Sequence, residues 1–359
     1  MSDETKPLYT RSILQKIPVR LFDEQEIYFG TYNGRFENFS IKGLRRPFGN
    51  LPLPRFITNT RVNSLMRLLF QNDDVIGELT FFVSSFFSAM ETVYWNKKTK
   101  KRNAYRQILP CGFIHLPKRL GYNITACRTR RRYIRILSRL TRGALYADID
   151  FPASTGRPAL EARFDVTFSG KECAELSAVT PFFVNKRFEA SYNFTAPMSG
   201  WLSENYFRDF IFPAESSVCF FDYRKAYCGL KTKRTFLSGF GRFDGKILSF
   251  QLNTSIAPDS DSYNDNLLFY GGEVTPLPPV KITMPFGIDK KWNIQDTEGM
   301  VDLTFEPASL LQRSSNFFLL RMNYTTVYGN FEGTLVRKNG SRIKLENYDG
   351  IAKRIQLRF

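Results

Sequence analysis

The region between residues 219 and 253 shows the clearest alternation of apolar and polar positions in the chain. Asp244 and Gly245 lie within it, and this pair is the strongest local signal for a type I′ hairpin, because both central positions of that turn need a positive φ. Behind the turn, every second side chain from Leu248 to Leu252 is apolar and the intervening ones are polar. This pattern predicts a half-buried antiparallel strand.

Short alternating or apolar segments recur along the rest of the chain, separated by turn residues. We expect strands in residues 78–95, 144–151, 163–168, 182–195, 301–305, 317–327 and 330–337, and hairpins at Asn33-Gly34 within residues 26–41 and at Asn339-Gly340. Residues 62–71 form the exception, because Leu65, Leu68 and Leu69 fall at helical spacing and predict a short helix. Many short strands with few helices indicate a barrel or a sandwich.

The chain of 359 residues is long enough for two domains. We expect a lead-in over residues 1–20, a β-barrel-like domain over residues 21–181 and a second barrel over residues 182–359. The junction would lie near Thr180 and Pro181.

The formal net charge is +17, with most of the basic excess in the first half of the chain. Such an excess attracts polyanions, which include nucleic acids, anionic lipid surfaces and acidic ligands. The five cysteines have no CxxC spacing, and the first residues do not resemble a signal peptide, which predicts reduced thiols and a cytoplasmic protein. The longest apolar run, residues 79–90, is too short for a spanning helix.

Signatures of catalysis are scarce. The single histidine, His115, lies in an apolar stretch and is interpreted as structural, and no metal site or cofactor is expected. Gly239, Gly241 and Gly245 do not have the spacing of a dinucleotide-binding loop and lie between predicted strands rather than before a helix.

A charged and aromatic group in the 219–253 region is the strongest candidate for a ligand site. Two interpretations remain open: a cross-strand ion pair at a barrel rim, or a polar anchor for an anionic head group inside a barrel lined by aromatic residues. Trp201 and Trp292 either help to line such a pocket or pack in a core. The candidate ligand-binding residues are Asp222, Tyr223, Arg224, Lys225, Arg234, Phe236, Trp201 and Trp292.

Residues 118–142 carry many basic side chains and no acidic one, and their centre fits either a strand or a helix with one basic face. Such a run is either a solvated surface or a contact with an anionic surface, for which a membrane fits better than nucleic acid, because Tyr133 is the only aromatic residue in the arginine-rich centre. On the second interpretation, we expect peripheral contact with the inner membrane face through Arg128, Arg130, Arg131, Arg132 and Arg135. A second basic run, residues 97–102, is predicted to be a solvated turn.

The order of motifs in the second half resembles the domain of unknown function 2804 family of uncharacterised bacterial proteins. The resemblance rests on these segments: Phe221-Asp222-Tyr223-Arg224, Arg234-Thr235-Phe236, residues 239–246, Gly271-Gly272-Glu273, residues 277–280, residues 301–305 and residues 328–335. Family members often carry Trp where this chain has Phe236 and Phe240, and a His near the C-terminus is absent here.

The resemblance implies an all-β fold with two antiparallel lipocalin-like (calycin) barrel or sandwich units in tandem and few short helices. It also implies a distant relationship to carotenoid hydratase-type proteins, whose substrates are apolar isoprenoids, and it transfers no catalytic residue.

Two functions follow as expectations. The first is a non-enzymatic, lipocalin-like binder of an apolar or amphipathic anionic small molecule of the lipid or isoprenoid type. The alternative is an acid/base enzyme, a hydratase or isomerase acting on a lipid-like substrate, with Asp222 as the acid and Tyr223 or Lys225 as its partner.

Overall fold

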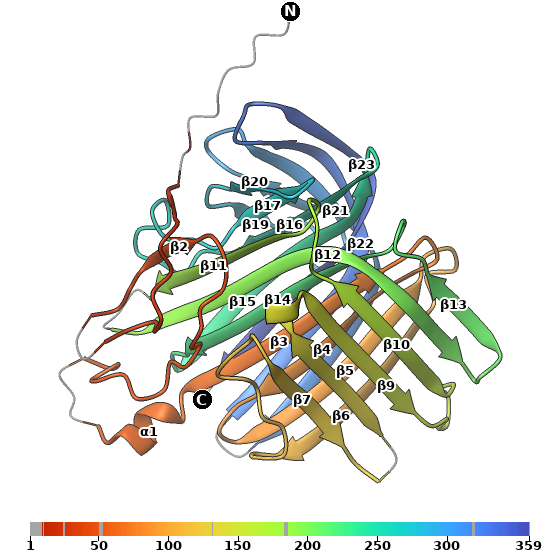
Figure 1. Ribbon diagram of the computed structural model, residues 1–359, viewed down its shortest axis with the longest axis horizontal. Coiled ribbons are helices and arrows are strands. Elements are labelled where there is room, and N and C mark those ends of the chain that lie inside the picture. The colour runs from red at the N-terminus through yellow and green to blue at the C-terminus, as the bar shows by residue number, and fades with distance from the viewer. Residues whose placement is uncertain are drawn as a thin grey trace, which may run out of the picture.

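The computed structural model describes residues 9, 11–23, 26–49, 53–130, 132–182, 186–317 and 320–358. Nearly all of its regular structure is β, in one sheet of 14 strands and one of nine. Both sheets are curled, as Figure 1 shows, and apart from the β1–β2 pair their strands run antiparallel. The expected all-β fold of two tandem units is therefore confirmed.

The first sheet is built from the N-terminal part of the chain, in the order β6-β5-β4-β3-β14-β12-β10-β9-β8-β7, with four further strands paired off this path. Its strands are β1 (Ile13–Leu14), β2 (Gly30–Tyr32), β3 (Val62–Gln71), β4 (Val75–Val83), β5 (Phe87–Asn96), β6 (Arg102–Pro110), β7 (Asn123–Arg128), β8 (Tyr133–Arg139), β9 (Ala144–Phe151), β10 (Leu160–Thr167), β11 (Ala174–Pro181), β12 (Phe188–Glu204), β13 (Arg208–Phe212) and β14 (Val218–Tyr227). The only helices among the described residues are α1 (Arg55–Asn59) and the 3₁₀ turn η1 (Leu140–Arg142).

The second sheet begins directly after β14 and has the order β18-β17-β16-β15-β23-β22-β21-β20-β19. Its strands are β15 (Lys231–Phe243), β16 (Lys246–Asn253), β17 (Leu267–Tyr270), β18 (Glu273–Pro276), β19 (Lys281–Thr283), β20 (Trp292–Gln295), β21 (Val301–Phe317), β22 (Leu320–Val336) and β23 (Arg342–Arg358). The chain thus passes between the sheets in the connection after Tyr227, downstream of the expected junction at residue 181.

Each sheet has its own apolar core, and a further apolar layer lies between the sheets. Side chains such as Met66, Phe70 and Tyr223 belong to the core of the first sheet, whereas Leu69 and Phe220, on the opposite faces of the same strands, pack with Phe240 and Tyr328 of the second sheet. The two curled sheets therefore pack against each other through faces that point away from their own cores.

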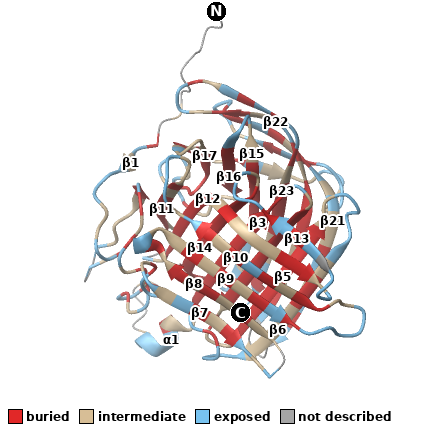
Figure 2. Ribbon diagram, turned by 45° about the vertical axis from the view of Figure 1, so that its right-hand side comes forward, coloured by how far each residue is buried: buried red, intermediate tan, exposed pale blue. Residues whose placement is uncertain are grey.

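This arrangement explains the burial pattern in Figure 2. Strands β3 and β14 are buried at every position, because one face meets the first core and the other meets the second sheet. Strand β8, in contrast, alternates between buried and half-buried positions, because the second sheet does not cover it.

The same double burial explains why the expected helix at residues 62–71 is wrong. Leu65 and Leu69 face the second sheet, whereas Leu68 faces the first core. Apolar residues therefore lie on both faces of the strand, and their spacing in the sequence resembles that of a helix. The segment is instead β3, paired with β4 and β14.

The predicted hairpins have different outcomes. Asp244 and Gly245 connect β15 to β16 with φ of 49° and 74°, which confirms the type I′ turn. Asn339-Gly340 does join β22 to β23, but only Gly340 of the two has a positive φ, so this connection is a longer loop. The hairpin at Asn33-Gly34 is wrong: within residues 26–41 only β2 is a strand, and it pairs with β1 and β11.

Candidate functional site between the sheets

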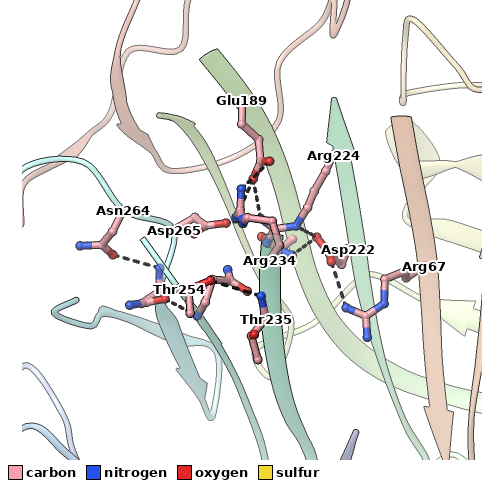
Figure 3. Close-up of polar contacts among 12 residues, drawn as sticks. Arg67, Glu189, Asp222, Arg224, Arg234, Thr235, Thr254, Asn264 and Asp265 are labelled. Carbon is pink, nitrogen blue, oxygen red and sulfur yellow. Dashed lines mark hydrogen bonds and ion pairs between the residues drawn. The ribbon is translucent and has the colours of Figure 1, made fainter. Parts of the chain in front are cut away.

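A group of charged side chains lies buried between the two sheets, and we call it the ionic cluster. Strands β3, β4, β12, β14, β15 and β23 and the loop before β17 supply its members, all of which are buried. Figure 3 shows most of them converging between the sheets. The ionic cluster consists of Arg67, Glu78, Glu189, Asp222, Arg224, Arg234, Asp265 and Lys353.

Arg67 joins two carboxylates of the first sheet. Its Nε and Nη2 donate to Glu78 Oε2 at 3.1 and 3.0 Å, and its Nη1 donates to Asp222 Oδ2 at 3.3 Å. Lys353 of the second sheet also donates to Glu78. Burial alone would raise the pKa of Glu78, but the charges of Lys353 and Arg67 outweigh it and lower that pKa from 4.5 to about 2.

Arg224 occupies the centre of the ionic cluster. It donates to Asp222 Oδ1 at 2.7 Å, to Glu189 Oε1 at 2.8 Å and to Asp265. Burial would lower the pKa of this guanidinium, but the three carboxylates outweigh it and raise the pKa above its usual value. For Asp265, burial is outweighed mainly by Arg224, and the pKa falls to about 2. Arg224 and Asp265 are therefore charged at neutral pH.

Arg234 connects the second sheet to Glu189 through two hydrogen bonds, of 2.8 and 3.1 Å. The Phe236 ring lies among the guanidinium groups, with its centroid 4.9 Å from Arg224 Cζ, 5.1 Å from Arg234 Cζ and 6.0 Å from Arg67 Cζ. The face of the ring attracts these desolvated guanidinium groups weakly through cation–π interactions.

A cavity of about 60 Å³ adjoins the ionic cluster, and Glu189, Arg224 and Arg234 help to line it. A smaller cavity of about 20 Å³ shares part of its wall. Most of the remaining lining of the larger cavity is apolar and comes from both sheets, namely Leu65, Phe82, Phe182, Ala226, Phe236, Ile355 and Leu357.

Two guanidinium donors beside this cavity have no acceptor among the described residues. Arg224 Nη2 and Arg234 Nε are buried and make no hydrogen bond with any described residue. A buried donor without a partner costs about 1–3 kcal/mol, so each such group calls for an explanation. A bound molecule that carries an oxygen acceptor would supply one.

The structure brings together four of the eight residues expected to bind a ligand: Asp222, Arg224, Arg234 and Phe236. Tyr223 and Lys225 point to the other face of β14, where both donate to the carbonyl of Pro117, at 2.6 and 2.8 Å. Burial, together with Lys42 and Lys118, lowers the pKa of Lys225 to about 7.

The two tryptophans lie away from the cavity. Trp292 is buried in the core of the second sheet, where its Nε1 donates to Ile288 O at 3.0 Å. Trp201 is half-buried on β12, opposite Arg163 and Ile211. Neither residue lines the inter-sheet cavity.

Sequence reasoning missed Arg67, Glu78, Glu189, Asp265 and Lys353. For Arg67 and Glu78 the sequence does contain a signal, because each is a single charge within an otherwise largely apolar strand. A charge in the middle of a strand buried on both faces needs a buried partner.

The basic run of residues 118–142 contains the β7–β8 hairpin. Of the two structures that the sequence left open for its centre, the strand is therefore correct. Arg135 is held by Asp148 at 2.6 Å, and Arg132 donates to Arg106 O and Gln107 Oε1. Arg128 and Arg130 are exposed, and Arg131 lies outside the described residues. Contact of this run with an anionic membrane stays a prediction.

Three further features of the described residues concern metal sites, cysteines and helices. No group of three or more His, Cys, Asp or Glu side chains is arranged there to hold a metal ion. All five cysteines are free. None of the described helices is both long and apolar enough to span a bilayer.

Comparison with known proteins identifies the family of this chain and two solved structures that resemble it distantly. The crystal structure of CghA with Sch210972 is 12% identical, with 91% of this chain and 97% of that chain covered and a TM-score of 0.47. Kievitone hydratase from Nectria haematococca is 10% identical, with 90% and 98% covered and a TM-score of 0.47. No curated protein sequence matches. The model of the family described as domain of unknown function (DUF2804) matches residues 63–359, and the chain therefore belongs to this family.

Proposed function

We propose that the protein binds an amphipathic small molecule by its polar end. The inter-sheet cavity, of about 60 Å³, takes only that end, with its oxygen acceptor on Arg224 and Arg234, and the rest of the ligand lies outside the cavity. The observation that carries this proposal is the pair of buried, unpartnered donors on two residues that line a largely apolar cavity. Ligand sites generally combine apolar walls with a few converging polar groups.

The charge balance of the ionic cluster indicates whether the polar end of the ligand is charged or neutral. Its four cations (Arg67, Arg224, Arg234 and Lys353) face four carboxylates (Glu78, Glu189, Asp222 and Asp265), so the formal charges cancel. An anionic head group would add an unbalanced buried charge beside Glu189, whereas a neutral carbonyl or hydroxyl oxygen would accept from the free N–H groups without that cost. We therefore propose a neutral acceptor in place of the anionic head group expected from the sequence.

Binding is supported more directly than acid/base catalysis. Both oxygens of Asp222 accept hydrogen bonds from arginines, and Asn193 donates to Oδ1 as well, at 3.0 Å. Both oxygens of Glu189 are likewise held by Arg224 and Arg234. Neither carboxylate presents an open oxygen from which a proton would pass to a substrate.

Filling the cavity should weaken ligand binding strongly while leaving the charges in place. Ala226 lines the cavity and is 8% exposed, and Ala104 is equally buried between the sheets but lines neither cavity. With the fluorescent fatty acid cis-parinaric acid as probe, Ala226→Leu should weaken binding at least tenfold, and Ala104→Leu should change it by less than twofold. Equal losses in both variants would contradict the site.

Competition against the same probe tests the head group. Methyl oleate and geranylgeraniol, which are neutral, should displace the probe at lower concentrations than oleate. Stronger displacement by oleate would contradict the charge-balance argument. Mass spectrometry of an organic-solvent extract of the purified protein provides a check without a probe, and the proposal fails if the extract holds no ligand and none of these lipids binds.

A further inference from the structure

The far ends of β15, β22 and β23 carry a second, separate set of charges on the face opposite to the ionic cluster. In the register of these strands, Lys231 lies opposite Arg358, which lies opposite Arg321. The next positions on the same face form a row of Lys233, Gln356 and Asn323, and then a row of Thr235, Arg354 and Thr325. We call this three-by-three set the basic face.

The basic face continues the concave, core-facing side of the second sheet. Two positions further along each strand, the same face carries Leu237, Ala352 and Val327, which are buried in the second core. Beyond that core the face opens into two hollows, of about 520 and 480 Å³, which share Arg321, Asn323 and Gln356 in their linings. The open end of a curled sheet is a common place for a ligand.

The charges of the basic face have no counter-charge among the described residues. None of its five cations, Lys231, Lys233, Arg321, Arg354 and Arg358, forms an ion pair with any described residue, and no Asp or Glu lines either hollow. Arg354 Nε is also buried without a hydrogen-bond partner within the described part of the chain. Like charges directly opposite each other on neighbouring strands are destabilising, and strands in a sheet lie only about 4.8 Å apart.

We propose that the basic face binds a polyphosphorylated anion. Its cations come from three adjacent strands and line two adjoining hollows that share Arg321, so they can reach several phosphate groups at once. Arg and Lys both pair strongly with phosphate oxygens. The concave shape does not fit a planar bilayer. The basic face carries no aromatic side chain on which nucleic-acid bases would stack.

The test is calorimetric titration of the full chain with inorganic tripolyphosphate. The variant Lys231→Gln/Arg321→Gln/Arg358→Gln should bind at least tenfold more weakly than the wild type. A matched control, Arg45→Gln/Arg55→Gln/Arg119→Gln, removes the same charge from exposed positions elsewhere and should bind within twofold of the wild type. Equal weakening in both variants would mean attraction to the net charge alone and would overturn the proposal.

Thermal unfolding separates loss of binding from loss of structure. Without ligand, the basic-face variant should melt at or above the wild-type temperature, because it relieves repulsion. Tripolyphosphate should raise the melting temperature of the wild type and of the control, but not that of the basic-face variant. A variant that melts lower without ligand would show that these cations have partners in the fold and would contradict the proposal.

Competitors identify the source of the phosphates. Inositol hexakisphosphate should compete with tripolyphosphate, and orthophosphate should compete only weakly because it has a single phosphate group. Tighter binding of single-stranded oligothymidylate or of phosphatidylserine vesicles than of tripolyphosphate, lost in the same variant, would overturn the assignment to a compact polyphosphate.

Discussion

Replacing Arg67 with methionine is expected to lower the free energy of unfolding by about 3–5 kcal/mol, the usual cost of leaving buried charges without a partner. Arg67 is fully buried and holds both Glu78 and Asp222, so the substitution removes one cation from between two carboxylates. Urea denaturation monitored by tryptophan fluorescence measures the effect. Because domains are typically stable by only 5–15 kcal/mol, this change is large.

Arg163→Met is the matched control for this experiment. Arg163 forms its ion pair with Asp165 at the surface, where the two side chains are 61% and 40% exposed, and such a pair contributes about 0–1 kcal/mol. A loss for Arg67→Met no greater than that of the control would mean that the ionic cluster does not hold the sheets together.

Acid should destabilise the protein between about pH 4.5 and pH 2, in large part through Glu78. The pKa of its carboxyl falls from 4.5 in the unfolded chain to about 2 in the folded protein, because Lys353 and Arg67 outweigh the effect of burial. The unfolded state therefore binds a proton first as the pH falls. The stabilisation is complete above pH 4.5 and is lost on the way to pH 2, by on the order of 3 kcal/mol.

The variant Glu78→Gln cannot take up this proton. It should be less stable than the wild type at pH 6, and the difference should narrow as the pH falls towards 3, as measured by urea denaturation at each pH. Glu346→Gln serves as control, because Glu346 pairs with Lys344 in solvent, with side chains 74% and 77% exposed. A difference for Glu78→Gln that does not change with pH would contradict the assigned pKa.

The sequence predicts the fold well where strands are buried on one face. The turn at Asp244 and Gly245 and the alternation that follows it are local features, and the structure confirms both. The prediction fails at β3, where the second sheet buries the other face and removes the alternation from which a strand is recognised. Packing of one sheet on another is a long-range property that no local pattern contains.

The candidate site was predicted only in part, because it too depends on contacts between residues that are far apart in the sequence. Asp222, Arg224, Arg234 and Phe236 lie close together in the sequence and meet in the structure, whereas Glu78 and Lys353 meet across 275 residues. Tyr223 and Lys225 alternate along β14 with Asp222 and Arg224. They therefore point to the opposite face of the strand, towards the first core, and away from the ionic cluster. The motif that resembles the family marks the right strand, but it does not say which of its faces carries the site.

The short connection between Tyr227 and Lys231 has a consequence for dissecting the molecule. All strands of the first sheet precede it and all strands of the second sheet follow it, so one cut there yields two fragments that each contain a whole sheet. Each fragment would expose its own part of the ionic cluster: five members lie on the first piece and three on the second, namely Arg234, Asp265 and Lys353. We expect each fragment to be insoluble when expressed alone and the two to reassemble into the folded protein when they are co-expressed.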